Sequence, residues 1–279
     1  MQQIATPKGT KDIISKYPFA FQKRFGQNFL IDPNILNKII VSSNITKEDI
    51  ILEIGPGIGS MTQALLQYAK EVISIEIDAQ LIPILTEQFK MYNNFKLIHN
   101  DILKVDILNL LPNSNVKVIA NLPYYITTPI IMKLLEEKLP IDSITIMVQK
   151  EVAQRFMSLP NNKNYGAITL AINFYCEVEF ICDVSKTCFM PVPNVDSAVI
   201  KLNIYKTPPV DVDNIKLLFR IIKLAFGQRR KTLVNSLSSE FDKEKIKNIL
   251  AEMDLNVNIR GEALSLKQYA NLTNLIEKN

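Results

Sequence analysis

The sequence IILEIGPGIGS, residues 50–60, decides the fold of this 279-residue chain. Its first five residues form a nearly continuous apolar run, which is typical of a parallel strand buried on both faces. The glycines that follow allow a tight turn and a close approach of the backbone to a ligand. A helical pattern over residues 60–70 comes next. Strand, turn and helix together indicate the first unit of a doubly wound α/β sheet with a ligand at the turn.

The strand pattern recurs along the middle of the chain, in residues 72–76, 95–98, 116–120 and 144–148. Helical spacing over residues 80–90 and 129–137 places helices between strands, so we predict a mostly parallel, Rossmann-like sheet. Residues 176–182 and 197–205 are expected to add antiparallel strands at its edge. Asp32 followed by Pro33 predicts the N-cap and first turn of a helix that runs through Val41.

The best domain boundary lies at the proline pair Pro208 and Pro209, because only helical patterns follow it. We therefore predict that residues 1–207 form the α/β domain, with an N-terminal extension, and that residues 208–279 form a smaller all-helical domain. The net charge is +4, but residues 216–250 hold nine basic and three acidic residues, so this segment carries +6 and the remainder −2. A local basic surface favours a nucleic-acid partner, although a basic run is also common on a solvated helix face.

Other features narrow the class of protein. There is no run of about 18 apolar residues and no secretory signal pattern, so we expect a cytoplasmic protein that does not bind membranes. The three cysteines, Cys176, Cys182 and Cys188, lack CxxC spacing and are interpreted as reduced thiols. Neither a zinc site nor any other metal is expected.

Acidic residues follow the next two strands after the glycine turn. The turn itself has GxGxG spacing, which differs from the GxGxxG of dinucleotide binders and lacks the GK[ST] of a P-loop. Glu76 lies 21 residues past Gly55, where a carboxylate can accept two hydrogen bonds from a ribose diol. Asp101 follows the third strand and could accept an adenine amine, or serve only as a helix N-cap. Three consecutive strand ends thus predict a nucleoside ligand.

This order of elements resembles the class I S-adenosylmethionine-dependent methyltransferases. The resemblance implies that the glycine turn and the two acids bind S-adenosylmethionine. The upstream segment FGQNFL, residues 25–30, resembles an element whose asparagine and leucine line the same pocket. The cofactor-binding residues implied by the resemblance are Asn28, Leu30, Gly55, Gly57, Glu76, Asp101 and Asn121.

The sequence NLPY, residues 121–124, follows the fourth strand and is the predicted catalytic motif. The N6 amine of adenine is a poor nucleophile because its lone pair is delocalised. A side-chain amide oxygen and a backbone carbonyl can redirect that lone pair by accepting both amine hydrogens, while an aromatic ring stacks on the base. Alone, the tetrapeptide could be an ordinary Asn-x-Pro turn. In phase with the glycine turn it resembles the [DNS]PP[YF]-type motif of amino-methylating enzymes.

That resemblance gives each residue a role. Asn121 and the Leu122 carbonyl accept the amine hydrogens, Pro123 keeps the turn rigid, and Tyr124 stacks on the base. No general base is needed, and His99 is interpreted as a strand-end residue. We hypothesise that Phe189 stacks on the opposite face of the base; the alternative is a core aromatic.

Six segments, residues 23–30, 53–59, 121–127, 149–155, 191–197 and 225–233, together resemble the KsgA/RsmA family of bacterial 16S rRNA adenine N6,N6-dimethyltransferases. The resemblance implies dimethylation of two adjacent adenosines in the 3′-terminal hairpin loop of 16S rRNA, late in assembly, within a pre-30S particle. A monomer is expected. The predicted RNA-binding residues are Lys23, Arg24, Arg155, Lys223, Arg229, Arg230 and Lys231.

Three other functions are compatible with parts of the sequence. An Erm-type enzyme would methylate one adenine of 23S rRNA, but the PVPNVDS and QRRKTL segments favour the small-subunit family. A non-enzymatic assembly or transcription factor could keep the fold without catalysis, which the intact glycine, acid and NLPY sets oppose. A NAD-dependent oxidoreductase is disfavoured by the GxGxG spacing.

Overall fold

The computed structural model describes residues 3–17, 19–22, 25–111, 116–228 and 230–278. The chain divides into two compact units, one of Met1–Ala153 with Glu179–Ile204 and the other of Gln154–Val178 with Tyr205–Asn279. The second unit thus contains residues 154–178 as well as the C-terminal helices. The boundary after residue 207, and the functions assigned on either side of it, stay predictions.

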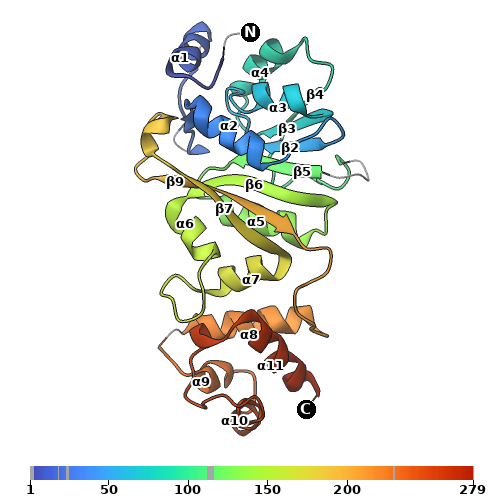
Figure 1. The fold of residues 1–279 in the computed structure, drawn as a ribbon, viewed down its shortest axis with the longest axis vertical. Helices are drawn as coiled ribbons and strands as arrows, with labels where there is room; N and C mark the ends of the chain where they lie inside the picture. The colour runs from blue at the N-terminus through green and yellow to red at the C-terminus, as the bar shows by residue number, and fades with distance from the viewer. Residues whose placement is uncertain (1–2, 18, 23–24, 112–115, 229, 279) are drawn as a thin grey trace. The chain divides into compact units, whose positions relative to one another are not determined.

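A seven-stranded sheet contains the five strands predicted from the apolar runs and both predicted edge strands (Figure 1). Its strands are β2 (Ile50–Ile54), β3 (Glu71–Glu76), β4 (Phe95–His99), β5 (Val116–Asn121), β6 (Ile141–Gln149), β7 (Cys176–Val184) and β9 (Ser197–Ile204). The order is β4-β3-β2-β5-β6-β9-β7. Strands β4 to β6 are parallel, and β9 pairs antiparallel with β6. The predicted fold class is confirmed.

Helices of the first unit follow the strands as the spacing predicts. They are α2 (Pro33–Ser42), α3 (Thr62–Tyr68), α4 (Leu81–Phe89), α5 (Thr127–Glu136) and α6 (Lys150–Phe156), the last of which extends past Ala153. The Asp32 carboxylate accepts hydrogen bonds from the N–H groups of Asn34 and Ile35, which confirms the predicted N-cap. The apolar faces of α2, α3 and α4 pack in one core cluster with alternate strand residues such as Ile51 and Val72.

Two features of this unit escaped prediction. Helix α1 (Pro7–Lys16) begins at a Thr6 N-cap, and its buried residues are Gly9 and Thr10 rather than an apolar stripe. Strand β1 (Phe29–Leu30) pairs antiparallel with β8 (Phe189–Met190), which follows the short 3-10 helix η2 (Lys186–Cys188). Strands of two residues carry no recognisable periodicity.

The second unit is helical. It contains α7 (Ala167–Tyr175), α8 (Ile215–Gly227), α9 (Leu233–Leu237), α10 (Lys243–Glu252), the 3-10 helix η3 (Gly261–Ala263) and α11 (Leu266–Lys278). These helices share one apolar core. Two buried tyrosine hydroxyls are satisfied by carbonyls, because Tyr165 donates to Leu264 and Tyr269 donates to Gly261, each over 2.8 Å. Burial without a partner would cost each hydroxyl at least about 1 kcal/mol.

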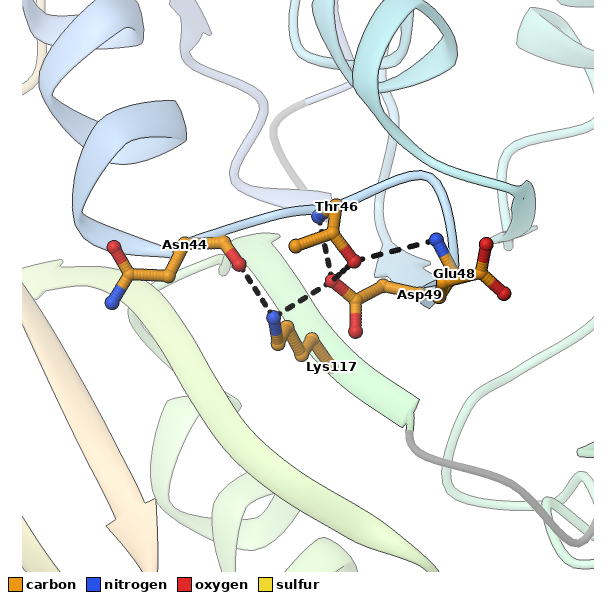
Figure 2. Close-up of polar contacts among 5 residues, drawn as sticks. All are labelled: Asn44, Thr46, Glu48, Asp49 and Lys117. Carbon is orange, nitrogen blue, oxygen red and sulfur yellow. Dashed lines mark hydrogen bonds and ion pairs between the residues drawn. The ribbon is translucent and has the colours of Figure 1, made fainter.

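An ion pair braces the amino ends of β2 and β5 (Figure 2). Lys117 Nζ donates to Asp49 Oδ2 over 2.8 Å and to the Asn44 carbonyl over 2.6 Å. Asp49 Oδ2 also accepts from the backbone N–H and the hydroxyl of Thr46, at 2.6 and 2.9 Å. The turn before β2 is therefore tied to β5 at the end of the sheet away from the glycine turn.

Among the residues described, no helix is long and apolar enough to cross a membrane. No cluster of three histidine, cysteine or acidic side chains suited to a metal ion occurs in the same part of the chain. Cys176, Cys182 and Cys188 are free cysteines.

Candidate cofactor and substrate site

A cavity opens at the carboxyl ends of β2, β3 and β5, where ligands bind in doubly wound sheets. Its wall includes all seven residues predicted to bind the cofactor: Asn28, Leu30, Gly55, Gly57, Glu76, Asp101 and Asn121. These residues come from segments up to 93 positions apart. The structure thus brings the predicted set together around one cavity.

The glycine turn needs glycine for two physical reasons. Gly55, Gly57 and Gly59 have φ angles of +69°, +60° and +88°, which side chains rarely tolerate. A β-carbon on Gly57 would also lie 3.0 Å from the ring of Phe29. The turn therefore keeps its backbone open to the cavity.

Glu76 is the most constrained acid of the cavity. Its carboxylate accepts hydrogen bonds from the N–H groups of Asp78, at 2.8 Å, and Gly57, at 3.2 Å. The side chain is almost fully buried, and this burial raises the pKa of Glu76 to about 7; the nearby charge of Asp78 raises it further, and the two backbone hydrogen bonds oppose the shift. Glu76 is thus held rigidly as an acceptor, but in an environment that penalises its charge.

Beneath the turn lies a second buried acid that sequence reasoning did not single out. Glu53 Oε2 accepts from the hydroxyls of Thr62, at 2.7 Å, and Ser74, at 2.6 Å, so it joins β2 to α3 and β3. Burial raises the pKa of Glu53 to about 7, in spite of both hydrogen bonds. A charged residue within an otherwise apolar strand was the available signal.

Asn28 and Asn121 are joined directly. Asn121 Nδ2 donates to the backbone carbonyl of Asn28 over 3.0 Å, and Asn28 Nδ2 donates to the Gly26 carbonyl over the same distance. Because its amide nitrogen is engaged in this way, Asn121 is oriented with its oxygen available as an acceptor. The side chain of the predicted catalytic residue is therefore fixed by the predicted cofactor loop.

Asp101 combines both roles considered from the sequence. It lines the cavity, while its Oδ1 accepts from the Leu103 N–H over 3.0 Å, as a turn cap does. Nearby His99 is exposed, and its Nε2 lies 3.3 Å from the Ile77 carbonyl. His99 is thus a strand-end residue and does not line this cavity among the described residues.

The NLPY turn forms the wall at the end of β5. Leu122, Pro123 and Tyr124 all line the cavity. The Pro123 carbonyl accepts from the Ile126 N–H and the Thr127 hydroxyl, each over 3.1 Å, and thereby starts α5. The Tyr124 hydroxyl lies 2.8 Å from Ser197 Oγ, and burial raises the pKa of Tyr124. The ring is therefore fixed at both its backbone and its hydroxyl.

Phe189 is placed differently. It is 1% exposed, pairs with Leu30 across the β1–β8 ladder and packs in the core, and it is not among the described residues that line the cavity. The alternative of a core aromatic describes its packing here. A role in base stacking stays a prediction.

The segment before β1 is held over the cavity by glutamine side chains. Gln27 Nε2 donates to Asp78 Oδ2 over 2.6 Å, and Gln27 Oε1 accepts from the Gln22 N–H over 2.8 Å. Phe19 and Phe21 pack against the Phe29 ring, with ring centroids 5.9 and 5.5 Å away. Gln27 lies within the FGQNFL motif, so its polarity was a signal, but its partner 51 residues away was not.

Four of the seven predicted RNA-binding residues are described. Arg155, Lys223, Arg230 and Lys231 belong to the second unit, and all are exposed. Lys23, Arg24 and Arg229 lie outside the described residues. Exposed cations suit phosphate contacts, but nothing in the structure tests RNA binding.

Comparisons with known proteins give consistent matches. The family model described as ribosomal RNA adenine dimethylase matches residues 18–278. Ribosomal RNA small subunit methyltransferase A of Lachnoclostridium phytofermentans is 50% identical, over 100% of this chain and 99% of its own. The same-named protein of Alkaliphilus oremlandii is 47% identical, with the same coverage.

Solved structures show the same likeness. A dimethyladenosine transferase from Plasmodium falciparum is 28% identical, with a TM-score of 0.75 over 88% of this chain and 95% of that one. The 23S rRNA methyltransferase ErmE, 24% identical, shares the fold with a TM-score of 0.70 over 90% of this chain and 100% of that one.

Proposed function

Since this chain belongs to the ribosomal RNA adenine dimethylase family, we propose that it methylates N6 of two adjacent adenosines in the 3′-terminal hairpin loop of 16S rRNA. The product is N6,N6-dimethyladenosine at both positions, formed late in small-subunit biogenesis. The enzyme acts as a cytoplasmic monomer on a pre-30S particle. The names of the bacterial relatives support a small-subunit substrate.

The cavity fits S-adenosylmethionine, which when bound supplies an electrophilic methyl group on its sulfonium. Glu76 accepts the two ribose hydroxyls, and Asp101 accepts the adenine amine. The open glycine turn, with no side chain at Gly57, leaves room for the cofactor beside Phe29. Ser60 Oγ lines the same cavity and has no hydrogen-bond partner among the described residues, so a polar ligand atom suits it.

Residues of the NLPY turn activate the target amine. Asn121 Oδ1 and the Leu122 carbonyl accept its two hydrogens, which redirects the nitrogen lone pair out of conjugation. No side chain takes up a proton during this step, so positioning and electrostatic complementarity supply most of the rate. Tyr124 stacks on the extruded base, and its hydrogen bond to Ser197 fixes the ring plane.

Substrate recognition is assigned to the basic residues of the second unit, Arg155, Lys223, Arg230 and Lys231, together with Lys23, Arg24 and Arg229. These side chains neutralise phosphates and hold the particle while the first unit performs the chemistry. Phosphate contacts carry no base information, so RNA shape selects the hairpin.

One observation carries the proposal: the hydrogen bond from Asn121 Nδ2 to the Asn28 carbonyl. It aligns a side-chain acceptor at the wall of the cofactor cavity. Amine methylation requires this geometry, whereas hydride transfer by a NAD-dependent oxidoreductase does not.

The test is transfer of a labelled methyl group from S-adenosylmethionine to purified ribosomal particles that lack the modification. We expect label in the RNA of 30S particles and none in 50S particles. Label in 50S RNA would instead assign the chain to the 23S-specific activity. Cofactor binding without transfer to either particle would make it a non-catalytic assembly factor.

A further inference from the structure

A second cavity lies at the end of β6, separate from the residues that line the cofactor cavity. Its described lining includes Gln149, Lys150, Glu151, Lys186, Asn194 and Asp196. All but Lys186 come from two segments, residues 149–155 and 191–197, that mark the family resemblance but have no role in the methyl-transfer chemistry above. Two unassigned segments thus build one polar cavity.

The cavity is part of the same rigid framework as the catalytic turn. Asn121 pairs with Met147 in the parallel β5–β6 ladder, so Gln149 lies two residues further along at the same edge of the sheet. Gln149 in turn pairs with Ser197, whose hydroxyl is hydrogen-bonded to Tyr124. The wall of the second cavity is therefore connected directly to the ring that is proposed to stack on the target adenine.

Backbone hydrogen bonds fix this wall. The Lys150 N–H donates to the Asp196 carbonyl over 3.1 Å, and the Lys186 N–H donates to Asp196 Oδ1 over 3.0 Å. The Lys150 ammonium is paired with Asp183 at 2.9 Å. The loop that carries Asn194 is thus held against β6 by contacts on both sides.

The charges of the lining favour a neutral ligand. Two lysines are balanced by two acids, Glu151 and Asp196, and Lys150 already has a carboxylate partner in Asp183. A phosphate would approach both carboxylates of the lining, whereas a nucleobase is uncharged and presents both donors and acceptors. The amide groups of Gln149 and Asn194 also offer both, which is the complement that a purine edge requires.

We propose that this cavity binds the purine base next to the adenosine that is being methylated. The inference rests on the proposed function, in which two adjacent adenosines are modified: while one occupies the catalytic cavity, its neighbour needs a place beside it. RNA-binding proteins commonly read splayed-out, unpaired bases on their hydrogen-bonding edges. The second cavity therefore selects the dinucleotide rather than a single adenosine.

The experiment uses 30S particles with one methylatable adenosine whose neighbour is either adenosine or uridine. Initial rates of dimethyladenosine formation are measured by nucleoside mass spectrometry, at saturating S-adenosylmethionine. Wild-type protein is expected to prefer the adenosine neighbour by about tenfold, the size typical of one well-formed base contact. Asn194→Ala and Gln149→Ala should each lose most of that preference and keep the wild-type affinity for S-adenosylmethionine.

Gln67→Ala, which removes an exposed amide near the end of α3, is the matched control and should keep the wild-type ratio. Thermal unfolding of each variant checks that it is folded. The proposal is overturned if both cavity variants retain the wild-type preference, or if wild-type protein shows none. If wild-type protein forms no dimethyladenosine on any particle, the proposed function itself fails, so the two failures are distinguishable.

Discussion

The backbone N–H of Gly57 donates a hydrogen bond of 3.2 Å to the carboxylate of Glu76. This contact joins the turn after β2 to the acid after β3, so the two parts of the predicted cofactor site form one surface. The same carboxylate is buried, which makes its protonation state part of ligand binding.

Cofactor affinity should depend on pH through Glu76. Burial raises the pKa of this acid to about 7, and the ionised form accepts the ribose hydroxyls best, so affinity should fall as pH drops below about 7. Calorimetric titration from pH 8 to pH 6 should show a loss approaching about tenfold per pH unit at the acid end. Glu76→Gln should bind more weakly at pH 8 and lose this component of the dependence. An unchanged pH profile in Glu76→Gln would contradict the assignment; Glu87→Gln, an exposed position of α4, is the control.

Gln27→Ala should loosen the segment over the cofactor cavity. The substitution removes the donor to Asp78 and the acceptor for the Gln22 N–H, and Asp78 in turn holds Glu76. We expect about tenfold weaker S-adenosylmethionine binding, the scale of one hydrogen bond to a charged group. Hydrogen exchange at the Gln22 amide should accelerate. If affinity and exchange both match wild type, the segment does not support the site.

Lys117→Met should destabilise the fold without changing cofactor affinity. Both partners of the Lys117–Asp49 pair are mostly buried, with side chains 14% and 9% exposed, so the substitution leaves a carboxylate without its cation. Urea unfolding should show a loss of about 3 kcal/mol. Lys90→Met, which breaks an exposed ion pair, should change stability little. Equal effects of the two substitutions would mean that burial adds nothing to the Lys117–Asp49 pair.

The same ion pair predicts a response to acid. Burial alone would raise the pKa of Asp49, but the hydrogen bonds and charge of Lys117 and Thr46 lower it below its ordinary value of 3.8. The stabilisation is therefore present above about pH 4 and lost as pH falls through the lower, folded-state pKa. Stability curves of wild type and Lys117→Met should converge below that range.

Charge removal in the second unit should weaken RNA binding in a salt-dependent way. Replacing Lys223, Arg230 and Lys231 together with alanine removes three exposed cations. Removing each phosphate-binding cation should reduce the slope of log affinity against log salt by somewhat less than one. Lys96→Ala, an exposed position of β4, should leave the slope unchanged. A uniform slope across all variants would place the RNA interface elsewhere.

Much of the fold follows from local patterns. The apolar run of β2, the glycines after it and the Asp32 cap each encode their own conformation, and all could be predicted from a few neighbouring residues. Helix α1 was missed because its buried positions are Gly9 and Thr10, which carry no apolar periodicity. The β1–β8 ladder was missed because it pairs two residues near the N-terminus with two residues far along the chain.

The site divides in the same way. Residues at strand ends could be placed around the cavity because parallel strands bring their carboxyl ends together. The position of Phe189 could not be predicted from the sequence, since its burial depends on pairing with Leu30. The bridge from Gln27 to Asp78 likewise depends on tertiary structure.

The decisive measurement is nucleoside mass spectrometry of 30S rRNA after reaction with wild-type protein, Asn121→Ala and the control Asn37→Ala, all at saturating S-adenosylmethionine. We predict N6,N6-dimethyladenosine with wild type and the control, and a rate at least about 100-fold lower with Asn121→Ala, because the substitution removes a positioned acceptor. Dimethyladenosine at the wild-type rate from Asn121→Ala would show that this amide does not activate the target amine.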